Sequence, residues 1–148
     1  MIDENTFDGK HLDFIGTMGI VYIGKEMLVY RRDGKAPSWP LCVGLPGGGR
    51  EGEETPFETL AREVKEEFNL NIKEKDIVYS RKYDSVEKPG KFAYFMVAKS
   101  KDLLEKDIVF GNEGLYYFLM DPAEYSSLED AVAPFKARIN SYLETLKE

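Results

Sequence analysis

Apolar and polar residues alternate along the chain in a pattern that predicts short strands and two helices. Residues 14–23 (FIGTMGIVYI) are apolar and rich in β-branched side chains, which is typical of a buried strand. After a Gly-Lys-Glu turn, residues 27–32 return as a second strand. Residues 33–40 (DGKAPSWP) contain the glycine and prolines of a loop, and residues 41–45 form a short extended piece.

The second half of the chain predicts three more strands. Residues 76–84 and 91–99 pair as a hairpin, because the connecting segment VEKPG contains a Pro-Gly pair. Residues 115–120 (LYYFLM) form a further strand. The Asp-Pro pair that follows is a good helix N-cap with a first-turn proline, and it predicts a short helical turn.

The last segment carries apolar residues at helical spacing. They are Leu128, Ala131, Val132, Phe135, Ile139, Tyr142, Leu143 and Leu146. Pro134 starts or kinks this helix, since proline cannot donate an interior helical hydrogen bond. Together the elements predict a single domain over residues 1–148 of class α/β (α+β). Its mixed β-sheet would lie between helices on both faces, as an α/β/α sandwich.

A helix in the middle of the chain is predicted by residues 55–69. Thr55, Pro56 and Glu58 fit a capping box with proline at the first helical position. The helix runs to about Phe68, and Asn69 suits a left-handed C-terminal cap. At 100° per residue one apolar stripe forms, which should pack on the sheet. The stripe consists of Phe57, Leu60, Ala61, Val64 and Phe68.

Three glutamates share a second face of this helix. Glu63, Glu66 and Glu67 follow the i, i+3, i+4 spacing, and Glu67 borders the apolar stripe, so it should be the most desolvated. Like charges at this spacing cost about 0.2–0.5 kcal/mol per pair, and the helix C-terminus disfavours anions further. One interpretation is a solvated acidic face. The other is a site for Mg²⁺ or Mn²⁺, because no His or Cys lies nearby for zinc.

Gly47, Gly48 and Gly49 precede the helix in the stretch LPGGGREG. They form either a plain tight turn or a segment whose backbone approaches a ligand closely. No Gly-Lys-Ser/Thr follows them, so they are not a Walker phosphate loop.

Composition narrows the classes of function. The 148 residues fit one domain, and 43% hydrophobic with 32% charged residues is a globular composition. The net charge of -7 argues against non-specific nucleic-acid or membrane binding, which needs Lys/Arg clusters. Cys42, the only cysteine, is interpreted as a small buried hydrophobe, and a reducing compartment is expected. His11, the only histidine, is interpreted as a surface residue, so a His-dependent triad is not expected.

The first residues and the hydropathy predict a cytoplasmic protein. The segment MIDENTFDGK has neither the basic start nor the apolar run of a signal peptide. No segment approaches the ~18 apolar residues that are needed to span a bilayer.

The glutamate-rich helix and its glycines resemble the Nudix box. That family pattern is Gly, five residues, Glu, seven residues, then Arg-Glu-aliphatic-any-Glu-Glu-any-Gly-aliphatic. It reads here as Gly48, Glu54, Arg62, Glu63, Val64, Glu66, Glu67, Asn69 and Leu70. Asn69 stands where glycine is usual. Because asparagine tolerates the left-handed conformation, this departure should affect stability more than chemistry.

The resemblance implies a hydrolase that cleaves the pyrophosphate linkage of a nucleoside diphosphate linked to a group X, with Mg²⁺ or Mn²⁺ as cofactor. By position, Glu63, Glu66 and Glu67 would be metal ligands. Gly47 would offer a carbonyl oxygen to the metal. Glu63 could also orient or deprotonate the attacking water.

Two further positions complete the expected catalytic set. Arg62 would pair with acidic neighbours, including Glu54, and hold the carboxylates in place. Some Nudix enzymes use another glutamate from a loop outside the box as base or ligand. Glu113 in FGNEG is the candidate here, and an ordinary loop-tip glutamate is the alternative.

Substrate recognition is less defined. Gly48 and Gly49 would approach the substrate, and Arg31 and Arg32 could touch phosphates, although a solvated strand end is an equal alternative. Aromatic residues suit base stacking, but most of them belong to apolar segments and are interpreted as core. They are Tyr22, Tyr30, Tyr83, Tyr94 and Phe95.

A small diffusible nucleotide is the expected partner, because the chain has no added domain or basic patch for RNA. No membrane or stable nucleic-acid binding is expected, and a homodimer is possible. Two other functions stay open. One is a Nudix-fold regulatory module that binds a nucleotide without hydrolysis, and the other is an acidic interaction protein with no metal.

Overall fold

The computed structural model describes residues 13–85 and 87–147, which form seven strands and two long helices. The strands are β1 (Phe14–Ile23), β2 (Glu26–Arg32), β3 (Val43–Gly44), β4 (Gly47–Gly49), β5 (Ile77–Asp84), β6 (Phe92–Ala98) and β7 (Gly114–Met120). The helices are α1 (Pro56–Phe68) and α2 (Ala133–Thr145), and short 3-10 helices are η1 (Glu74–Asp76), η2 (Glu105–Asp107) and η3 (Pro122–Ser127). In this part of the chain no helix is long and apolar enough to cross a membrane. The predictions for His11 and for the first ten residues lie outside the described residues.

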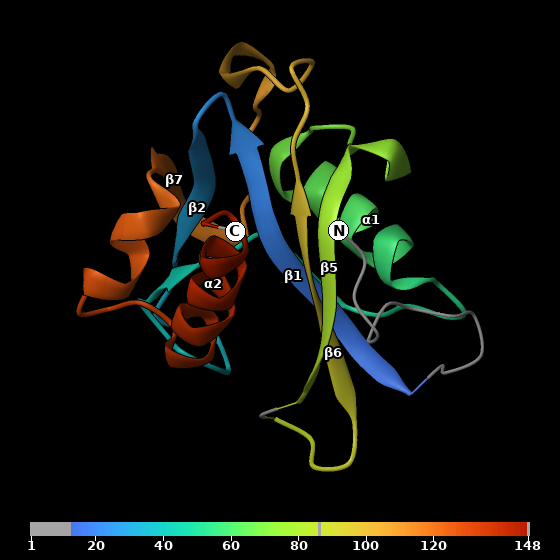
Figure 1. Cartoon of the computed structure of the whole chain (residues 1–148). Helices are drawn as coiled ribbons and strands as arrows, with labels where there is room; N and C mark the ends of the chain where they lie inside the picture. Colours follow the sequence, from blue (N-terminus) through green and yellow to red (C-terminus); the bar gives the residue numbers. More distant parts are fainter. Residues whose placement is uncertain (1–12, 86, 148) are drawn as a thin grey trace.

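The strands form one mixed sheet centred on β1 (Figure 1). On one side β1 runs parallel to β6, and β6 pairs with antiparallel β5, which confirms the predicted hairpin. On its other side β1 has two antiparallel partners, with β4 beside its first half and β2 at its end. β2 then pairs with β7 and β3. The long central strand thus joins both halves of the sheet.

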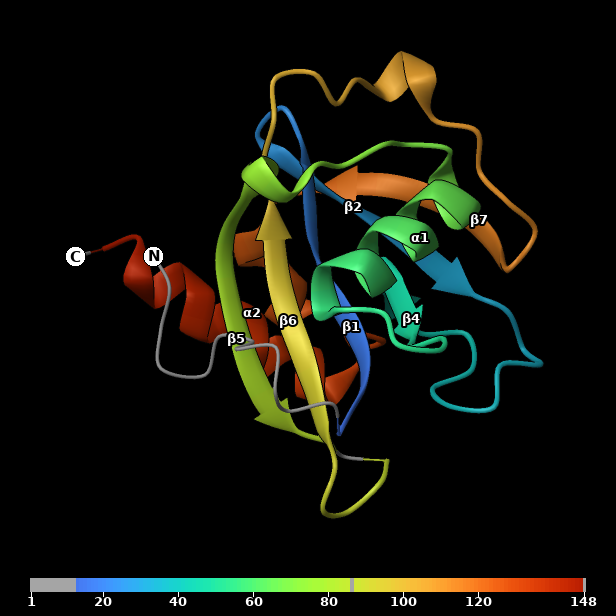
Figure 2. The same cartoon turned by 90° about the vertical axis from the view of Figure 1, so that its right-hand side faces the viewer.

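The two helices cover opposite faces of the sheet (Figures 1 and 2). Leu60 and Val64 of α1 are fully buried in one hydrophobic cluster. Phe135, Ile139 and Tyr142 of α2 belong to a second cluster on the other face. This arrangement confirms the predicted α/β/α sandwich with a mixed sheet.

Helix α1 is capped at both ends as its sequence predicts. The Thr55 hydroxyl accepts a hydrogen bond from the Glu58 N–H at 3.2 Å, and the Glu58 carboxylate accepts one from the Thr55 N–H at 2.9 Å. Asn69 adopts the left-handed conformation with φ 59, and its N–H donates to the Lys65 carbonyl at 3.0 Å. The substitution of glycine by asparagine therefore keeps the C-terminal cap.

Helix α2 begins later than the apolar spacing suggests. Pro134 lies in its first turn and starts the helix without kinking it. Leu128 and Val132 precede the helix, because hydrogen bonds of the Tyr125 hydroxyl hold this segment in a non-helical conformation. The Tyr125 hydroxyl donates to the Val43 carbonyl at 2.6 Å and accepts from the Val132 N–H at 3.0 Å. These bonds connect the segment before α2 to strand β3.

Residues 41–45 differ from the extended piece that the sequence predicts. Only Val43 and Gly44 form a strand, because Leu41 has a left-handed φ of 61. The Leu41 N–H donates to the Asp33 carbonyl at 3.2 Å and so closes the preceding loop. Cys42 is partly buried, instead of fully buried, and packs against the hydrophobic cluster on the α2 face.

Candidate functional site

The three glycines form strand β4, so the tight-turn interpretation is wrong. A Cβ built on Gly48 would lie 2.5 Å from Cδ of Glu63, and one on Gly47 would lie 2.2 Å from the Thr17 carbonyl oxygen. Gly47 also has φ 137, which side-chain-bearing residues rarely adopt. The absence of side chains therefore lets β4 pack closely against β1 and against a carboxylate of α1.

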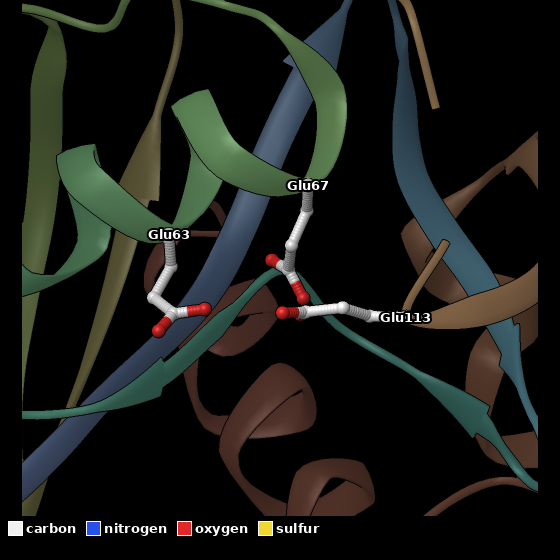
Figure 3. A group of neighbouring side chains, drawn as sticks. All are labelled: Glu63, Glu67 and Glu113. Carbon is white, nitrogen blue, oxygen red and sulfur yellow. The ribbon is translucent and has the colours of Figure 1, made fainter. Parts of the chain in front are cut away.

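Three carboxylates converge beside this strand (Figure 3). Glu63 and Glu67 come from α1 and Glu113 from the loop before β7, and one oxygen of each lies within 4.8 Å of the others. Glu67 is only 4% exposed, as its place beside the apolar stripe predicts. One Glu67 oxygen accepts a hydrogen bond from the Gly47 N–H at 3.1 Å. We call these three glutamates the acidic cluster.

Burial makes Glu67 and Glu63 costly to ionise. It raises the pKa of the Glu67 carboxyl to about 9, the Gly47 hydrogen bond opposes this, and the charges of Glu63 and Glu113 reinforce it. Burial also raises the pKa of Glu63, although Arg62 opposes that shift. A bound cation would relieve this cost. Because the cluster offers only carboxylate oxygens, it fits Mg²⁺ or Mn²⁺ and does not fit a soft metal.

Arg62 holds Glu63 of the acidic cluster in place, and all three nitrogens of its guanidinium group donate hydrogen bonds. Its Nε donates to Glu54 at 2.8 Å, and its terminal nitrogens donate to Glu63 at 2.8 Å and to the Gly49 carbonyl at 2.7 Å. The Glu51 carboxylate lies 3.1 Å from the same group. The structure therefore places Arg62 and Glu54 in the expected network, and it ties α1 to β4.

Glu66 lies apart from the acidic cluster. Its side chain is 48% exposed and accepts a hydrogen bond from Arg62 at 3.2 Å. A role for Glu66 as a metal ligand stays a prediction, and it requires the side chain to turn away from Arg62.

A cavity of about 630 Å³ opens beside the acidic cluster, large enough for a nucleotide-sized ligand. All three members of the cluster line this cavity. The backbone of β4, the loop of residues 33–39 and the first residues of α2 line it as well. The carboxylates thus face a space that a small molecule could enter.

Residues 14–143 match the family model of the NUDIX domain. The chain belongs to the NUDIX family. The matched segment runs from the start of β1 into the end of α2, so it includes both the acidic cluster and the cavity. No curated protein sequence matches the chain.

Solved structures share the NUDIX fold of this chain at low sequence identity. The MutT protein from Methanosarcina mazei Go1 is 20% identical, with a TM-score of 0.76 over 91% of this chain and 96% of that one. A C. elegans Ap4A hydrolase in a binary complex is 17% identical, with a TM-score of 0.67 over 89% and 98%. A bifunctional NMN adenylyltransferase/ADP ribose pyrophosphatase from Francisella tularensis, in complex with AMP and Mn ion, is 20% identical, with a TM-score of 0.58. That match covers 72% of this chain and 33% of the larger enzyme.

The two arginines at the end of β2 lie on opposite faces of the NUDIX sheet, as successive strand residues do. Arg32 lines the cavity, and its Nε donates to the Ser38 carbonyl at 3.0 Å. Arg31 does not line the cavity. It pairs with Asp130 and donates to the Leu41 carbonyl at 2.9 Å. Only Arg32 of this pair is therefore placed to reach a ligand beside the acidic cluster.

Most of the aromatic residues considered for stacking belong to the NUDIX core, as expected. Tyr22, Tyr94 and Phe95 are buried and do not line the cavity, whereas Tyr30 is buried and does line it. Tyr83 is half-buried.

The sequence predicted no role in the cavity for Trp39 or Arg138. Trp39 is 38% exposed with φ 53 and lies in the predicted loop of residues 33–40. Arg138 lies among the buried residues of α2. The sequence does contain a signal for Arg138, because a charged residue interrupts the apolar stripe three positions after Phe135. For Trp39 we find no comparable signal.

The Glu54–Arg62 pair should make the stability of this NUDIX domain depend on acid pH. Hydrogen bonds from Arg62 lower the pKa of Glu54 to about 2. A lowered carboxyl pKa contributes stability above the ordinary value near 4.5, and that contribution disappears as the pH falls toward 2. Glu54→Gln should therefore lower the free energy of unfolding by about 1–2 kcal/mol at pH 7 and have almost no effect near pH 2. Urea unfolding at both pH values checks this, and an equal loss at both would contradict it.

Proposed function

We propose that this NUDIX domain is a divalent-metal-dependent hydrolase that cleaves the pyrophosphate linkage of a nucleoside diphosphate linked to X, such as a nucleoside triphosphate. The observation that carries the proposal is the convergence of Glu63, Glu67 and Glu113 at a nucleotide-sized cavity. Three carboxylates would repel an anionic phosphate, so the site suits such a substrate only with cations between them. The nucleotide substrates named for the structural relatives support the same class of reaction.

The residues that would hold the metal come from two neighbouring elements. Glu63 and Glu67 would supply carboxylate oxygens from α1, and Gly47 would supply its carbonyl from β4. Glu66 would join them after its side chain leaves Arg62. Bound Mg²⁺ or Mn²⁺ would offset the charge of the phosphates and make water more acidic. The hydrogen bonds of Arg62 would hold the Glu63 carboxylate and strand β4 in place during the reaction.

Glu113 is the best-placed general base. Glu67 accepts a hydrogen bond from Gly47, and Glu63 accepts one from Arg62, so each has an oxygen already engaged. Among the described residues, Glu113 has no hydrogen-bond partner and belongs to a Gly-flanked loop. Its carboxylate can therefore take a proton from the attacking water at the least cost to other contacts. Glu63 is the alternative base.

The substrate phosphates would lie between the acidic cluster and β4. Gly48 and Gly49 line the cavity and let a ligand approach the backbone. Arg32 lies on the same cavity and could contact phosphate oxygens that the metal does not. Arg31 is not assigned to the substrate, because Asp130 and the Leu41 carbonyl already hold it.

Release of phosphate or pyrophosphate from a panel of nucleotides tests the proposal. The panel should contain nucleoside triphosphates, nucleotide sugars and dinucleoside polyphosphates, each with Mg²⁺, with Mn²⁺ and with excess chelator. We expect turnover of at least one substrate, and loss of that turnover with chelator. Saturable nucleotide binding without any turnover would instead indicate the regulatory module. Turnover that persists with chelator would contradict the metal requirement.

Gly48→Ala should lower the hydrolysis rate about 100-fold, because the new methyl group would displace the Glu63 carboxylate. Gly49→Ala is the control for folding, since the nearest atom to its new Cβ is the Ile15 carbonyl oxygen at 3.8 Å; its rate is not a control, because Gly49 lines the cavity. The control should keep the melting temperature of the native protein. The measurements are the initial hydrolysis rates and the melting temperatures of both variants. An unchanged rate in Gly48→Ala would show that the position of Glu63 does not matter for the reaction.

A further inference from the structure

Arg138 is a buried cation that the metal site does not use. It lies on α2, is 6% exposed and shares a face with Phe135, Ile139 and Tyr142. Within the described part of the chain it has no hydrogen-bond or ion-pair partner. Its contacts are with two rings, as its Cζ lies 5.0 Å from the ring centroid of Tyr83 and 6.0 Å from that of Phe135.

The ring contacts leave the hydrogen-bonding capacity of Arg138 unused. A guanidinium carries five N–H donors, and an aromatic face accepts none of them as strongly as an oxygen or a ring nitrogen does. A buried charged donor without an acceptor is costly, so native proteins rarely contain one without a reason. Arg138 lines the same cavity as the acidic cluster. A ligand in that cavity could supply the missing acceptors.

The surroundings of Arg138 favour a flat, neutral ligand group over a phosphate. The cavity walls from β1, β6 and the start of α2 are mostly apolar. They are Ile15, Gly16, Met18, Ala93, Val132, Pro134 and Phe135. Glu87 also lines the cavity and would repel a second anion. A phosphate normally collects several donors, whereas a nucleobase needs apolar contact on its faces and a few polar contacts at its edge.

We propose that Arg138 is a specificity-determining residue that recognises a 6-oxopurine base, guanine or hypoxanthine, through the O6 and N7 atoms. This inference rests on the proposed function, in which the acidic cluster takes the phosphates at another part of the cavity. The planar fork of arginine matches two adjacent acceptors, and O6 with N7 form such a pair. Adenine presents an amino group in place of O6, so one donor of Arg138 would face another donor.

Steady-state kinetics with GTP, ITP, ATP and 7-deaza-GTP in Mg²⁺ test this assignment. For the native protein, kcat/KM for GTP and ITP should exceed that for ATP by about 10–100-fold. Loss of N7 in 7-deaza-GTP should lower kcat/KM about tenfold without any change to the protein. Arg138→Met should lower kcat/KM for GTP and ITP by about 10–100-fold and so abolish their advantage over ATP. Lys136→Met on the same helix is the control and should keep the native ratio.

Each other result identifies a different role. The assignment is wrong if Arg138→Met lowers kcat/KM equally for all four substrates. It is also wrong if the native protein shows no preference for 6-oxopurine nucleotides. If Arg138→Lys restores full activity on GTP, the partner is an anionic group and not the base edge, because lysine keeps the charge but loses the fork. Hydrolysis of nucleotides without base preference would leave the proposed function standing. Absence of all hydrolysis would overturn that function. The role of Arg138 would then be tested by calorimetric titration of GTP and of ATP into the native protein. Equal affinities for the two nucleotides would contradict recognition of the base by Arg138.

Discussion

Replacement of Glu67 by glutamine should lower the rate of nucleotide hydrolysis at least about 100-fold, since charge stabilisation by a bound metal is worth several kcal/mol. Glutamine has nearly the same size and still offers an oxygen to the Gly47 N–H, which now donates to Glu67 at 3.1 Å. The substitution therefore removes the negative charge at the buried centre of the acidic cluster while keeping its shape. The measurement is kcat at saturating Mg²⁺ on the best substrate of the panel.

Two further observations make the Glu67 result interpretable. Far-UV circular dichroism and the melting temperature should show that Glu67→Gln is folded. In the metal-free protein the substitution should even be tolerated well, because burial already disfavours the charged form of Glu67. Glu124→Gln on η3 is an isosteric control away from the cavity and should have the native rate. Native activity in a folded Glu67→Gln protein would exclude Glu67 from the metal site.

Glu113→Gln should lower kcat about 100-fold at neutral pH, which is the lower range for loss of a general base. Glu113 is the member of the acidic cluster that comes from outside the NUDIX motif. If it takes the proton from water, the variant should keep its affinity for Mn²⁺ within a fewfold and lose the acid limb of the pH–rate profile. If it is mainly a metal ligand, metal affinity should fall together with the rate.

The test of Glu113 therefore combines a pH–rate profile with a metal titration on the same preparation. A native rate in Glu113→Gln would remove it from the reaction and leave Glu63 as the base. A low rate with an unchanged pH profile would also contradict the role as base, because loss of the base should alter how the rate depends on pH.

Local signals in the sequence were sufficient to predict helix α1 closely. Thr55, Glu58 and Asn69 make the expected caps, and Glu67 is the most buried of the three glutamates on its face. These features depend on residues within one or two turns of each other, so the sequence contains all of their determinants. The α/β/α architecture followed from the same kind of periodicity.

Contacts between distant segments were predicted less well. Three consecutive glycines have little intrinsic strand propensity, and β4 exists because β1 accepts them as a partner. The spacing of the last apolar residues suggested a longer helix, but Tyr125 and Pro134 set a later start. The separation of Glu66 from the acidic cluster depends on where Arg62 points, which helical spacing does not specify.

The site was predicted only in part, because some of its residues lie on one helix and others come from distant segments. Glu63, Glu67 and Arg62 lie on one helix, so their proximity follows from its geometry. Glu113 and Arg138 reach the cavity only through the fold, from the loop before β7 and from α2. Glu113 could be suggested by resemblance to a family, whereas Arg138 became apparent only when its burial and its lack of a polar partner were seen.

Calorimetric titration of Mn²⁺ into the native protein and into Glu67→Gln tests the central claim most directly. That claim is that Glu63 and Glu67 of the acidic cluster hold a divalent metal that makes the NUDIX domain a hydrolase. We predict saturable binding to the native protein and at least about tenfold weaker binding to the folded variant, since one buried ligand has lost its charge. Absence of saturable binding to the native protein, or equal affinity in the two proteins, would contradict the claim.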